Sequence, residues 1–236
     1  MDELHRRLLK IGFAAGDDLG LMLAGGYAIC AHDLVDRPSQ DIDFATSAVM
    51  PLPVVTDRLA AAYVAAGFSA RIIESTPRMA RLLISDDVTS CEVDLLKEAL
   101  APPARMALGP VLAFEDAVGL KVRALHDRAA HRDYIDVRAA HGRLGWSELE
   151  RLGARHTAGF SLDELADRLG GVIERDVRTF RSYGLTEPQV DELRGWALRW
   201  EADIRARLAN GETGPPGIPD DDWDAYLDRP GSTRPR

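Results

Sequence analysis

The hydrophobic pattern of the first hundred residues switches several times between helical and strand-like spacing. Apolar positions three and four apart predict amphipathic helices, whereas short apolar runs and strict alternation predict strands. One apolar run ends in Gly25 and Gly26, which is typical of a buried strand entering a turn. The pattern therefore predicts a mixed α/β unit over residues 1–100, with helices at 3–15, 27–34 and 54–67 and strands at 21–24, 41–46, 68–75, 79–85 and 90–96.

Beyond a connector at residues 101–110 the pattern becomes helical, beginning with runs at 114–130 and 132–144. A Ser or Thr followed three residues later by Glu or Gln marks a helix start, because each side chain satisfies a backbone N–H of the other residue. We therefore predict an all-helical bundle over residues 101–208, followed by a Pro/Gly/Asp-rich tail at 209–236. Three such capping boxes are present: Ser147 with Glu150, Ser161 with Glu164, and Thr186 with Gln189.

The composition, 46% hydrophobic over 236 residues, provides enough apolar side chains for a large core without disulfides. The two cysteines, Cys30 and Cys91, each lie in an apolar segment with a regular pattern, which indicates reduced, buried thiols. The chain opens without a signal-peptide pattern, and no run approaches the roughly 18 apolar residues of a membrane span. We expect a cytoplasmic protein with no membrane association.

The charge is distributed unevenly along the chain. A formal net charge of −9 argues against strong nonspecific binding of nucleic acid, because Lys and Arg contacts to phosphate dominate that affinity. Residues 121–155 nevertheless carry eight basic and five acidic side chains, whereas the segment IPDDDWDAYLD at 218–228 carries five aspartates. Acid at the end of the chain therefore masks a basic middle segment.

Two glycines and two aspartates flank the predicted helix at 27–34. Such glycines let the backbone approach a phosphate, although a glycine pair by itself is most often an ordinary tight turn. Asp41 and Asp43, two positions apart on a strand, point to the same face, and Asp94 has a similar place on another predicted strand. If these three aspartates lay on a solvent-facing edge strand, water would solvate their charges and no cation would be needed. On a buried face three carboxylates repel one another unless a cation neutralises them, so they predict a site for one or two Mg²⁺ ions.

The stretch LAGGYAICAHDLVDRPSQDIDF, residues 23–44, resembles motif I of the nucleotidyltransferase superfamily. It is similar in particular to the AbiEii/AbiGii-like branch, which includes the MenT toxins of bacterial toxin–antitoxin pairs. A later signature of that branch, a helix lysine followed by a K-D-x-x-D helix, resembles Lys121 and then Asp133 with Asp136, with His131 and Arg132 where the family often has a lysine. The motif I residues are Gly25, Gly26, Arg37, Ser39, Asp41, Asp43 and Phe44.

The resemblance implies an α/β (α+β) nucleotidyltransferase fold for the N-terminal unit, and a helical part at 101–208 that adds Lys121 and Asp136 to the site. It implies Mg²⁺ or Mn²⁺ as the cofactor and an NTP as the substrate. Asp94 would accept the proton of the attacking hydroxyl, with Glu92 as a weaker substitute. The implied catalytic residues are Asp41, Asp43, Asp94, Lys121 and Asp136; the metal ligands are Asp41, Asp43 and Asp94; the nucleotide-binding residues are Gly25, Gly26, Arg37, Ser39 and Lys121.

Lys121 illustrates how the resemblance changes an interpretation. Its spacing alone favours a solvated helix lysine, but it is one of three lysines, with Lys10 and Lys97, among 29 basic Lys and Arg residues. A lysine in that helix is therefore unusual for this chain, and the resemblance assigns it to the triphosphate. Asp133 and Asp136, three positions apart, could orient Lys121 or the base of the nucleotide.

The function implied by the resemblance is that of a toxin. Such an enzyme transfers a nucleoside monophosphate, preferentially a pyrimidine nucleotide, from an NTP to the 3′ end of tRNA and so blocks translation, with an antitoxin encoded nearby. The basic segment 121–155 supports tRNA as the acceptor, whereas the acidic chain as a whole suits a small polycationic acceptor such as an aminoglycoside. The residues are also compatible with transfer to a protein hydroxyl, or with a binding module that has no catalytic activity.

Overall fold

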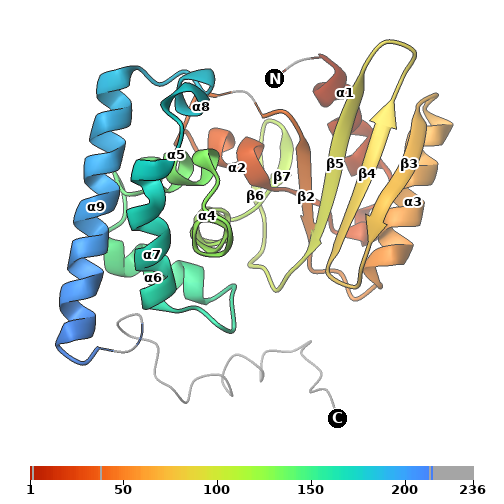
Figure 1. The fold of residues 1–236 in the computed structure, drawn as a ribbon. Helices are drawn as coiled ribbons and strands as arrows, with labels where there is room; N and C mark the ends of the chain where they lie inside the picture. The colour runs from red at the N-terminus through yellow and green to blue at the C-terminus, as the bar shows by residue number, and fades with distance from the viewer. Residues whose placement is uncertain (2, 38, 213, 215–236) are drawn as a thin grey trace.

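The computed structural model describes residues 1, 3–37, 39–212 and 214, and a seven-stranded mixed sheet lies at its centre (Figure 1). The strand order is β3-β4-β5-β2-β1-β7-β6, so that β2 and β5, far apart in the sequence, lie side by side in parallel. The strands are β1 (Met22–Leu23), β2 (Ile42–Thr46), β3 (Ser69–Ser75), β4 (Met79–Ser85), β5 (Ser90–Lys97), β6 (Ala104–Met106) and β7 (Gly109–Val111).

Helices cover the sheet and also form a separate part of the molecule beside it (Figure 1). Helix α1 packs on α3, which lies against β3, β4 and β5, whereas α2 contacts β2 and α4. Helix α4 in turn packs against α5, α6 and α7, and α9 packs against α5 and α7. The helices are α1 (Glu3–Ala14), α2 (Gly25–Ala31), α3 (Leu52–Ala65), α4 (Phe114–Asp127), α5 (His131–Ala140), α6 (Trp146–Ala154), α7 (Leu162–Gly170), α8 (Val177–Ser182) and α9 (Glu187–Ala209), with short 3-10 turns at η1 (Asp17–Leu19) and η2 (Gly171–Glu174).

Two hydrophobic clusters stabilise the fold, and they meet within α4. The first cluster lies around the sheet and includes the fully buried Phe44 and Tyr63, and its last residue is Ala117. The second begins at the next residue, Val118, and contains the buried Trp196 and Trp200 of α9. Because burial of apolar surface is the main stabilising term in folding, α4 ties the two clusters into one structure.

The mixed α/β architecture with a helical C-terminal part confirms the fold class predicted from the sequence. The connector at 101–110 differs from its prediction, because β6 and β7 form a hairpin there and β7 extends the sheet beside β1. Each strand has only three residues, too few to show an alternating pattern, and Gly109 in the hairpin has a φ of 118°. The geometry of this turn, rather than hydrophobic periodicity, specifies the hairpin.

The helix starts agree only in part with their predictions. Helix α2 begins at Gly25, two residues earlier than expected, so the glycines form its first turn. Ser161 and Thr186 cap α7 and α9 as predicted. The predicted box of Ser147 with Glu150 is wrong, since α6 begins at Trp146 and the Glu150 carboxylate instead accepts hydrogen bonds from Trp200 and Arg207.

None of the described helices is long and apolar enough to cross a membrane. Cys30 and Cys91 are thiols, in α2 and β5 respectively. The acidic segment at 218–228, and with it most of the tail predicted for 209–236, lies outside the described residues.

Candidate functional site

The predicted carboxylates lie at the centre of the sheet, where β2 and β5 run parallel. Asp43 of β2 is paired in register with Asp94 of β5, and Asp41 comes directly before β2. Alternation of side chains along the strand places Asp41 on the same side as Asp43. Burial, together with the negative charges of Asp41 and Asp94, raises the pKa of Asp43 to about 6, despite the opposing effect of Lys121. The sheet therefore brings three acidic groups together with an excess of negative charge.

The first turn of α2 passes directly over Asp43. Gly25 has a φ of 56°, and a Cβ atom there would lie 1.7 Å from Oδ2 of Asp43. At Gly26 a Cβ atom would lie 2.7 Å from the Ser39 hydroxyl oxygen. Both positions therefore need glycine, because any side chain would collide with the acidic strand or with Ser39.

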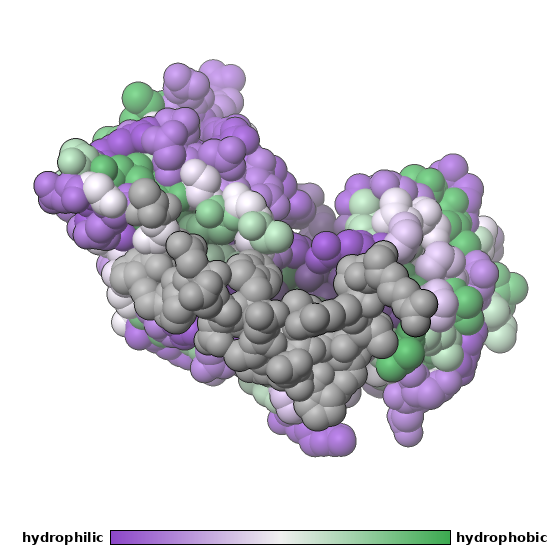
Figure 2. Space-filling model, turned by 90° about the horizontal axis from the view of Figure 1, so that it is seen from below, coloured by the Kyte–Doolittle hydropathy of each residue, from purple (hydrophilic) through white to green (hydrophobic). Residues whose placement is uncertain are grey.

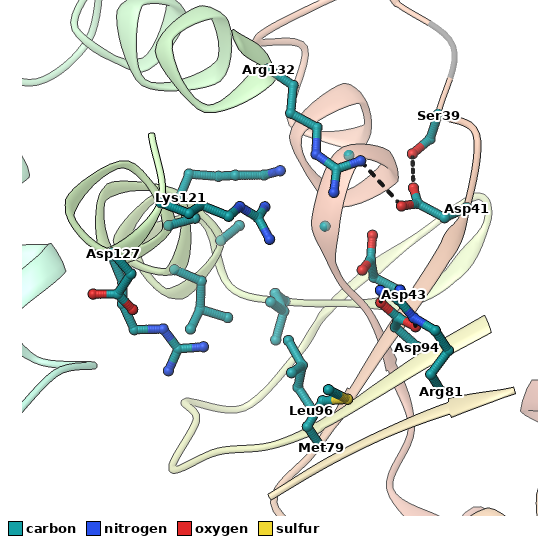
Figure 3. A pocket seen from close by; sticks show the side chains of 18 of the residues that line it. Ser39, Asp41, Asp43, Met79, Arg81, Asp94, Leu96, Lys121, Asp127 and Arg132 are labelled. Carbon is teal, nitrogen blue, oxygen red and sulfur yellow. Dashed lines mark hydrogen bonds and ion pairs between the residues drawn. The ribbon is translucent and has the colours of Figure 1, made fainter. Parts of the chain in front are cut away.

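Asp41 is held by two neighbours on opposite sides (Figure 3). The Ser39 hydroxyl donates a hydrogen bond of 2.9 Å to Oδ1, and Arg132 of α5 donates one of 3.2 Å to Oδ2. Burial disfavours the charged form of Asp41, but Arg132, the Ser39 hydroxyl and Lys121 together keep its pKa below the usual value. These contacts therefore favour the charged form of Asp41.

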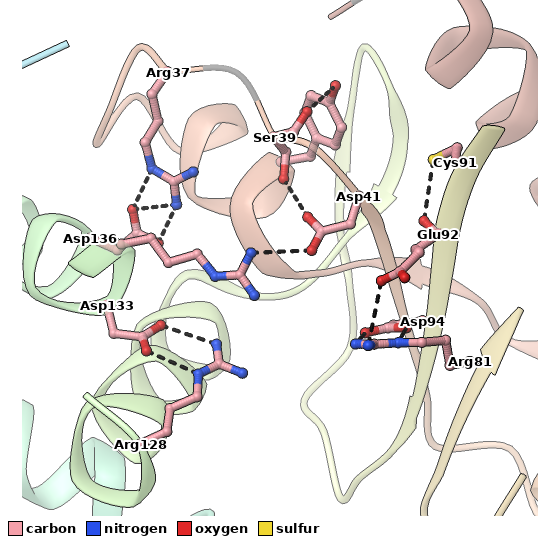
Figure 4. Close-up of polar contacts among 12 residues, drawn as sticks. Arg37, Ser39, Asp41, Arg81, Cys91, Glu92, Asp94, Arg128, Asp133 and Asp136 are labelled. Atoms are coloured by element: carbon pink, nitrogen blue, oxygen red, sulfur yellow. Dashed lines mark hydrogen bonds and ion pairs between the residues drawn. The ribbon is translucent and has the colours of Figure 1, made fainter. Parts of the chain in front are cut away.

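Asp94 makes a two-pronged contact with Arg81, its cross-strand neighbour on β4. Two guanidinium nitrogens of Arg81 donate hydrogen bonds of 2.8 and 2.7 Å to the two Asp94 oxygens. The hydrogen bonds to Asp94 raise the pKa of Arg81, which also lies 3.4 Å from Glu92 (Figure 4). Sequence reasoning missed Arg81, although a polar residue within the apolar run at 79–85 was a signal that it faces something other than the core.

Asp136 is fully buried and does not line the pocket; it contacts two cations that do. Arg37 donates to both of its oxygens, at 2.8 and 2.6 Å (Figure 4). Nζ of Lys121 lies 2.9 Å from Oδ2. Although burial works against it, the charge of Asp136 raises the pKa of Arg37. Asp136 thus positions Arg37 and Lys121 rather than touching a substrate itself.

The structure separates Asp133 from Asp136 despite their similar spacing. Asp133 accepts hydrogen bonds from Arg128, at 3.0 and 3.2 Å, and from the backbone N–H of Ala130 at 3.0 Å. It therefore caps the start of α5 and neutralises Arg128 (Figure 4). The hypothesis that Asp133 orients Lys121 is not supported by these contacts.

One pocket of 370 Å³ collects most of the predicted site residues (Figure 3). It lies between the sheet and α4, and a hollow between the sheet and the helical part is bordered by hydrophilic side chains in Figure 2. The sequence-predicted residues that line it are Gly25, Gly26, Arg37, Ser39, Asp41, Asp43, Asp94 and Lys121, and further basic residues that line it are Arg81, Arg123, Arg128 and Arg132.

A divalent metal ion fits the chemistry of this donor set. Mg²⁺ and Mn²⁺ prefer carboxylate oxygens. Burial and the negative charges of Asp41 and Asp94 disfavour the charged form of Asp43, and a bound cation would favour it. Among the described residues, however, no three His, Cys, Asp or Glu side chains are already spaced to hold an ion. The carboxylates are not spaced for an ion because Asp94 accepts hydrogen bonds from Arg81 and Asp41 accepts one from Arg132.

Comparisons with known proteins point in one direction. A model of the family described as nucleotidyl transferase AbiEii toxin, type IV toxin–antitoxin system, matches residues 7–229. MenT4, a nucleotidyltransferase toxin from Mycobacterium tuberculosis H37Rv, is structurally similar with a TM-score of 0.52 and 18% identity, covering 86% of this chain and 78% of that one. JHP933 from Helicobacter pylori has a TM-score of 0.50 and 17% identity, covering 89% of this chain and 96% of that one. No curated protein sequence matches the chain.

Proposed function

The chain belongs to the AbiEii family of nucleotidyltransferase toxins of type IV toxin–antitoxin systems, and on this premise we propose that it transfers a nucleoside monophosphate from an NTP to the 3′ end of tRNA. This reaction would block translation, and the family implies an antitoxin partner. The observation that carries the proposal is the single pocket that joins Asp41, Asp43 and Asp94 to Lys121. Acidic oxygens beside cations are what a metal-dependent transfer of a phosphorylated group requires.

Asp41, Asp43 and Asp94 are the proposed ligands of Mg²⁺ or Mn²⁺. A bound divalent ion supplies positive charge against the α-phosphate and the leaving pyrophosphate. For Asp94 to ligate an ion, its carboxylate must share or leave its two hydrogen bonds to Arg81. Arg81 would then be available for a phosphate oxygen of the nucleotide.

The triphosphate is assigned to the end of the pocket that is formed by Gly25, Gly26 and Ser39. Gly25 and Gly26 leave the backbone of α2 open there, and the Ser39 hydroxyl lies beside them. Lys121 and Arg37 line the same pocket, and Asp136 holds both through ion pairs. These groups bind and orient the triphosphate, with Lys121 neutralising part of its charge.

In the proposed reaction, an acceptor hydroxyl attacks the α-phosphorus in line. The new phosphorus–oxygen bond forms as the bond to pyrophosphate breaks, and the hydroxyl proton passes to a carboxylate of the site, for which Asp94 is our candidate. A pyrimidine nucleotide is part of the proposal and rests on the family resemblance. The acceptor is assigned as RNA because Arg123, Arg128 and Arg132 surround the pocket.

Incubation with labelled nucleotides tests the proposal. Purified protein is combined with Mg²⁺, total bacterial RNA and each of the four α-labelled NTPs in turn, and the RNA is separated on a denaturing gel. We expect label in a tRNA-sized band with a pyrimidine nucleotide, and none with an Asp41→Ala variant, which removes one of the charged oxygens of the site. Equal labelling by that variant would refute the catalytic role of the acidic group.

The net charge of −9 favours a second candidate, a small polycationic acceptor such as an aminoglycoside. A protein hydroxyl is the third class of acceptor. If no RNA is labelled with any nucleotide, the same incubation with aminoglycosides, and then with the product of the neighbouring gene, tests these two classes of acceptor.

A further inference from the structure

A second cavity lies next to the pocket and has no role in the proposed chemistry of nucleotide binding. It has a volume of 560 Å³ and lies between the ends of β4 and β5, α4, and the loop that follows α6. Met79, Leu96, Arg123 and Asp127 line both cavities, so the two spaces adjoin along a shared wall. The residues that line the second cavity alone include Arg78, Glu98, Arg155, His156 and Thr157.

The position of this second cavity relative to the triphosphate is informative. In Figure 3, Met79 and Leu96 lie on the far side of Asp43 and Asp94 from Ser39, and Asp127 lies across the pocket from these aspartates, on α4. The triphosphate is assigned to the end with Ser39 and the glycines. Because the second cavity adjoins the pocket at Met79 and Leu96, it offers a path to the acidic group from the side away from Ser39. An in-line attack needs the acceptor hydroxyl on the side opposite the leaving pyrophosphate.

Charge in the second cavity favours an anion. Glu98 is neutralised by Arg123 at 2.6 Å and meets Arg78 only at 3.4 Å, with the Arg78 side chain 75% exposed. Asp127 accepts a hydrogen bond from His126 at 2.8 Å if that ring nitrogen carries the proton. Within the described part of the chain, the Arg155 side chain makes no hydrogen bond or ion pair. Two guanidinium groups, those of Arg78 and Arg155, are thus left with unused hydrogen-bond donors.

Thr157 adds a further unused polar group. Its hydroxyl is buried without a hydrogen-bond partner among the described residues, an arrangement that carries a free-energy penalty. An oxygen-rich ligand would provide the missing acceptor. Within the described lining of this cavity there is no Phe, Tyr or Trp side chain on which a nucleobase would stack, and the side chain of His156 is buried.

We propose that the second cavity binds the phosphodiester backbone of the single-stranded 3′ end of an RNA acceptor, through Arg78 and Arg155. The inference rests on the proposed function, since it names the path by which the acceptor reaches the pocket. Arginine binds phosphate through its planar set of donors. The lining of the cavity carries three arginines, Arg78, Arg123 and Arg155, against Glu98 and Asp127, and this excess of positive charge disfavours a polycation. The local charge of the cavity thus outweighs the net charge of the chain in selecting the acceptor.

Steady-state kinetics and direct binding test the inference. The variants are Arg78→Ala, Arg155→Ala and the double substitution, with Arg178→Ala, an exposed arginine of α8, as a control that removes the same charge. We expect the double variant to raise the KM for RNA by about tenfold while the KM for the NTP stays unchanged. In fluorescence anisotropy with a short single-stranded RNA, each substitution should lower the salt-dependence slope by about 0.7.

The ways in which the inference can fail are distinguishable from one another. A higher KM for the NTP in place of that for RNA would show that the cavity holds the nucleotide, and would overturn the inference while leaving the transferase intact. Unchanged binding and unchanged KM values in the double variant would also overturn it. If the native protein labels no RNA, the proposed function fails. Anisotropy then still tests the inference, because the double variant should lose more affinity for single-stranded RNA than Arg178→Ala does.

Discussion

Arg37 and Asp136, 99 positions apart in the sequence, form a buried two-pronged ion pair. Arg37 lies between α2 and β2 and Asp136 lies in α5, so the pair connects the sheet to the helical part. Asp136 also holds Lys121, so one buried carboxylate contacts two buried cations.

Asp136→Asn should destabilise the protein strongly, because it removes the buried negative charge that Arg37 and Lys121 both contact. Breaking a buried pair by removing one partner costs about 3–5 kcal/mol. Urea denaturation of the variant measures this loss. Glu192→Ala, in α9, removes the partner of Arg138 of α5, and because this pair is more exposed the substitution should cost less than about 1 kcal/mol. Equal costs for the two substitutions would show that Asp136 does not hold the site together.

Lys121→Gln should affect activity more than stability. Asp136 keeps its contact with Arg37 when Lys121 is changed, so the fold remains, whereas the triphosphate loses a neutralising charge. We expect a loss of about a hundredfold in kcat/KM for nucleotide transfer. Circular dichroism checks the fold, and Lys10→Gln, an exposed lysine of α1, is the matched control. A fully active Lys121→Gln variant would show that Lys121 has no role in binding the triphosphate.

Asp43→Asn should make the metal-free protein more stable at neutral pH while abolishing transfer. The pKa of Asp43 is about 6 in the folded protein against an ordinary value of 3.8, so ionisation is disfavoured by folding. The folded state therefore loses stability as the pH rises from about 4 to above 6, and an amide avoids that loss. Thermal unfolding in EDTA should show a higher Tm for the variant at pH 8 and a smaller difference at pH 4. A lower Tm for Asp43→Asn than for the native protein at pH 8 would contradict the view that burial and neighbouring carboxylates disfavour the charged form of Asp43.

Arg81→Ala should increase the affinity of the protein for Mn²⁺ in the absence of nucleotide. Arg81 occupies both oxygens of Asp94, and its removal leaves that carboxylate available beside Asp43. Electron paramagnetic resonance titration with Mn²⁺ measures the Kd directly. Arg71→Ala, on the exposed strand β3, provides the control, because it removes an arginine that does not contact the acidic group. A higher Kd for Mn²⁺ in Arg81→Ala than in Arg71→Ala would show that Arg81 helps to assemble the metal site.

Local patterns predicted the fold class well, because the amphipathic helices and the longer strands have clear periodicity. They also placed Asp94 on a strand, and the structure pairs it with Asp43. The contact between Arg81 and Asp94 could not be predicted from the sequence, because it depends on the register of β4 against β5, which no local pattern reveals.

The two acids of α5 show a similar limit. Asp133 and Asp136 share one helix and an i, i+3 spacing, yet the first caps the helix and the second neutralises Arg37 and Lys121. The difference arises from what packs against each turn of α5, which is decided by the tertiary structure. The same applies to Glu150, whose partners Trp200 and Arg207 come from α9. Sequence spacing identified acidic positions, and long-range packing determined what each one does.

The joining of the two hydrophobic clusters within α4 has a consequence for the order in which the chain is made. The pocket takes residues from Gly25 to Arg132, and α9, which packs against α5, ends at Ala209. During synthesis, all pocket residues leave the ribosome before the helix that secures α5 is available. With the function proposed here, we expect the growing polypeptide to begin modifying tRNA only after α9 has been made and has packed against α5.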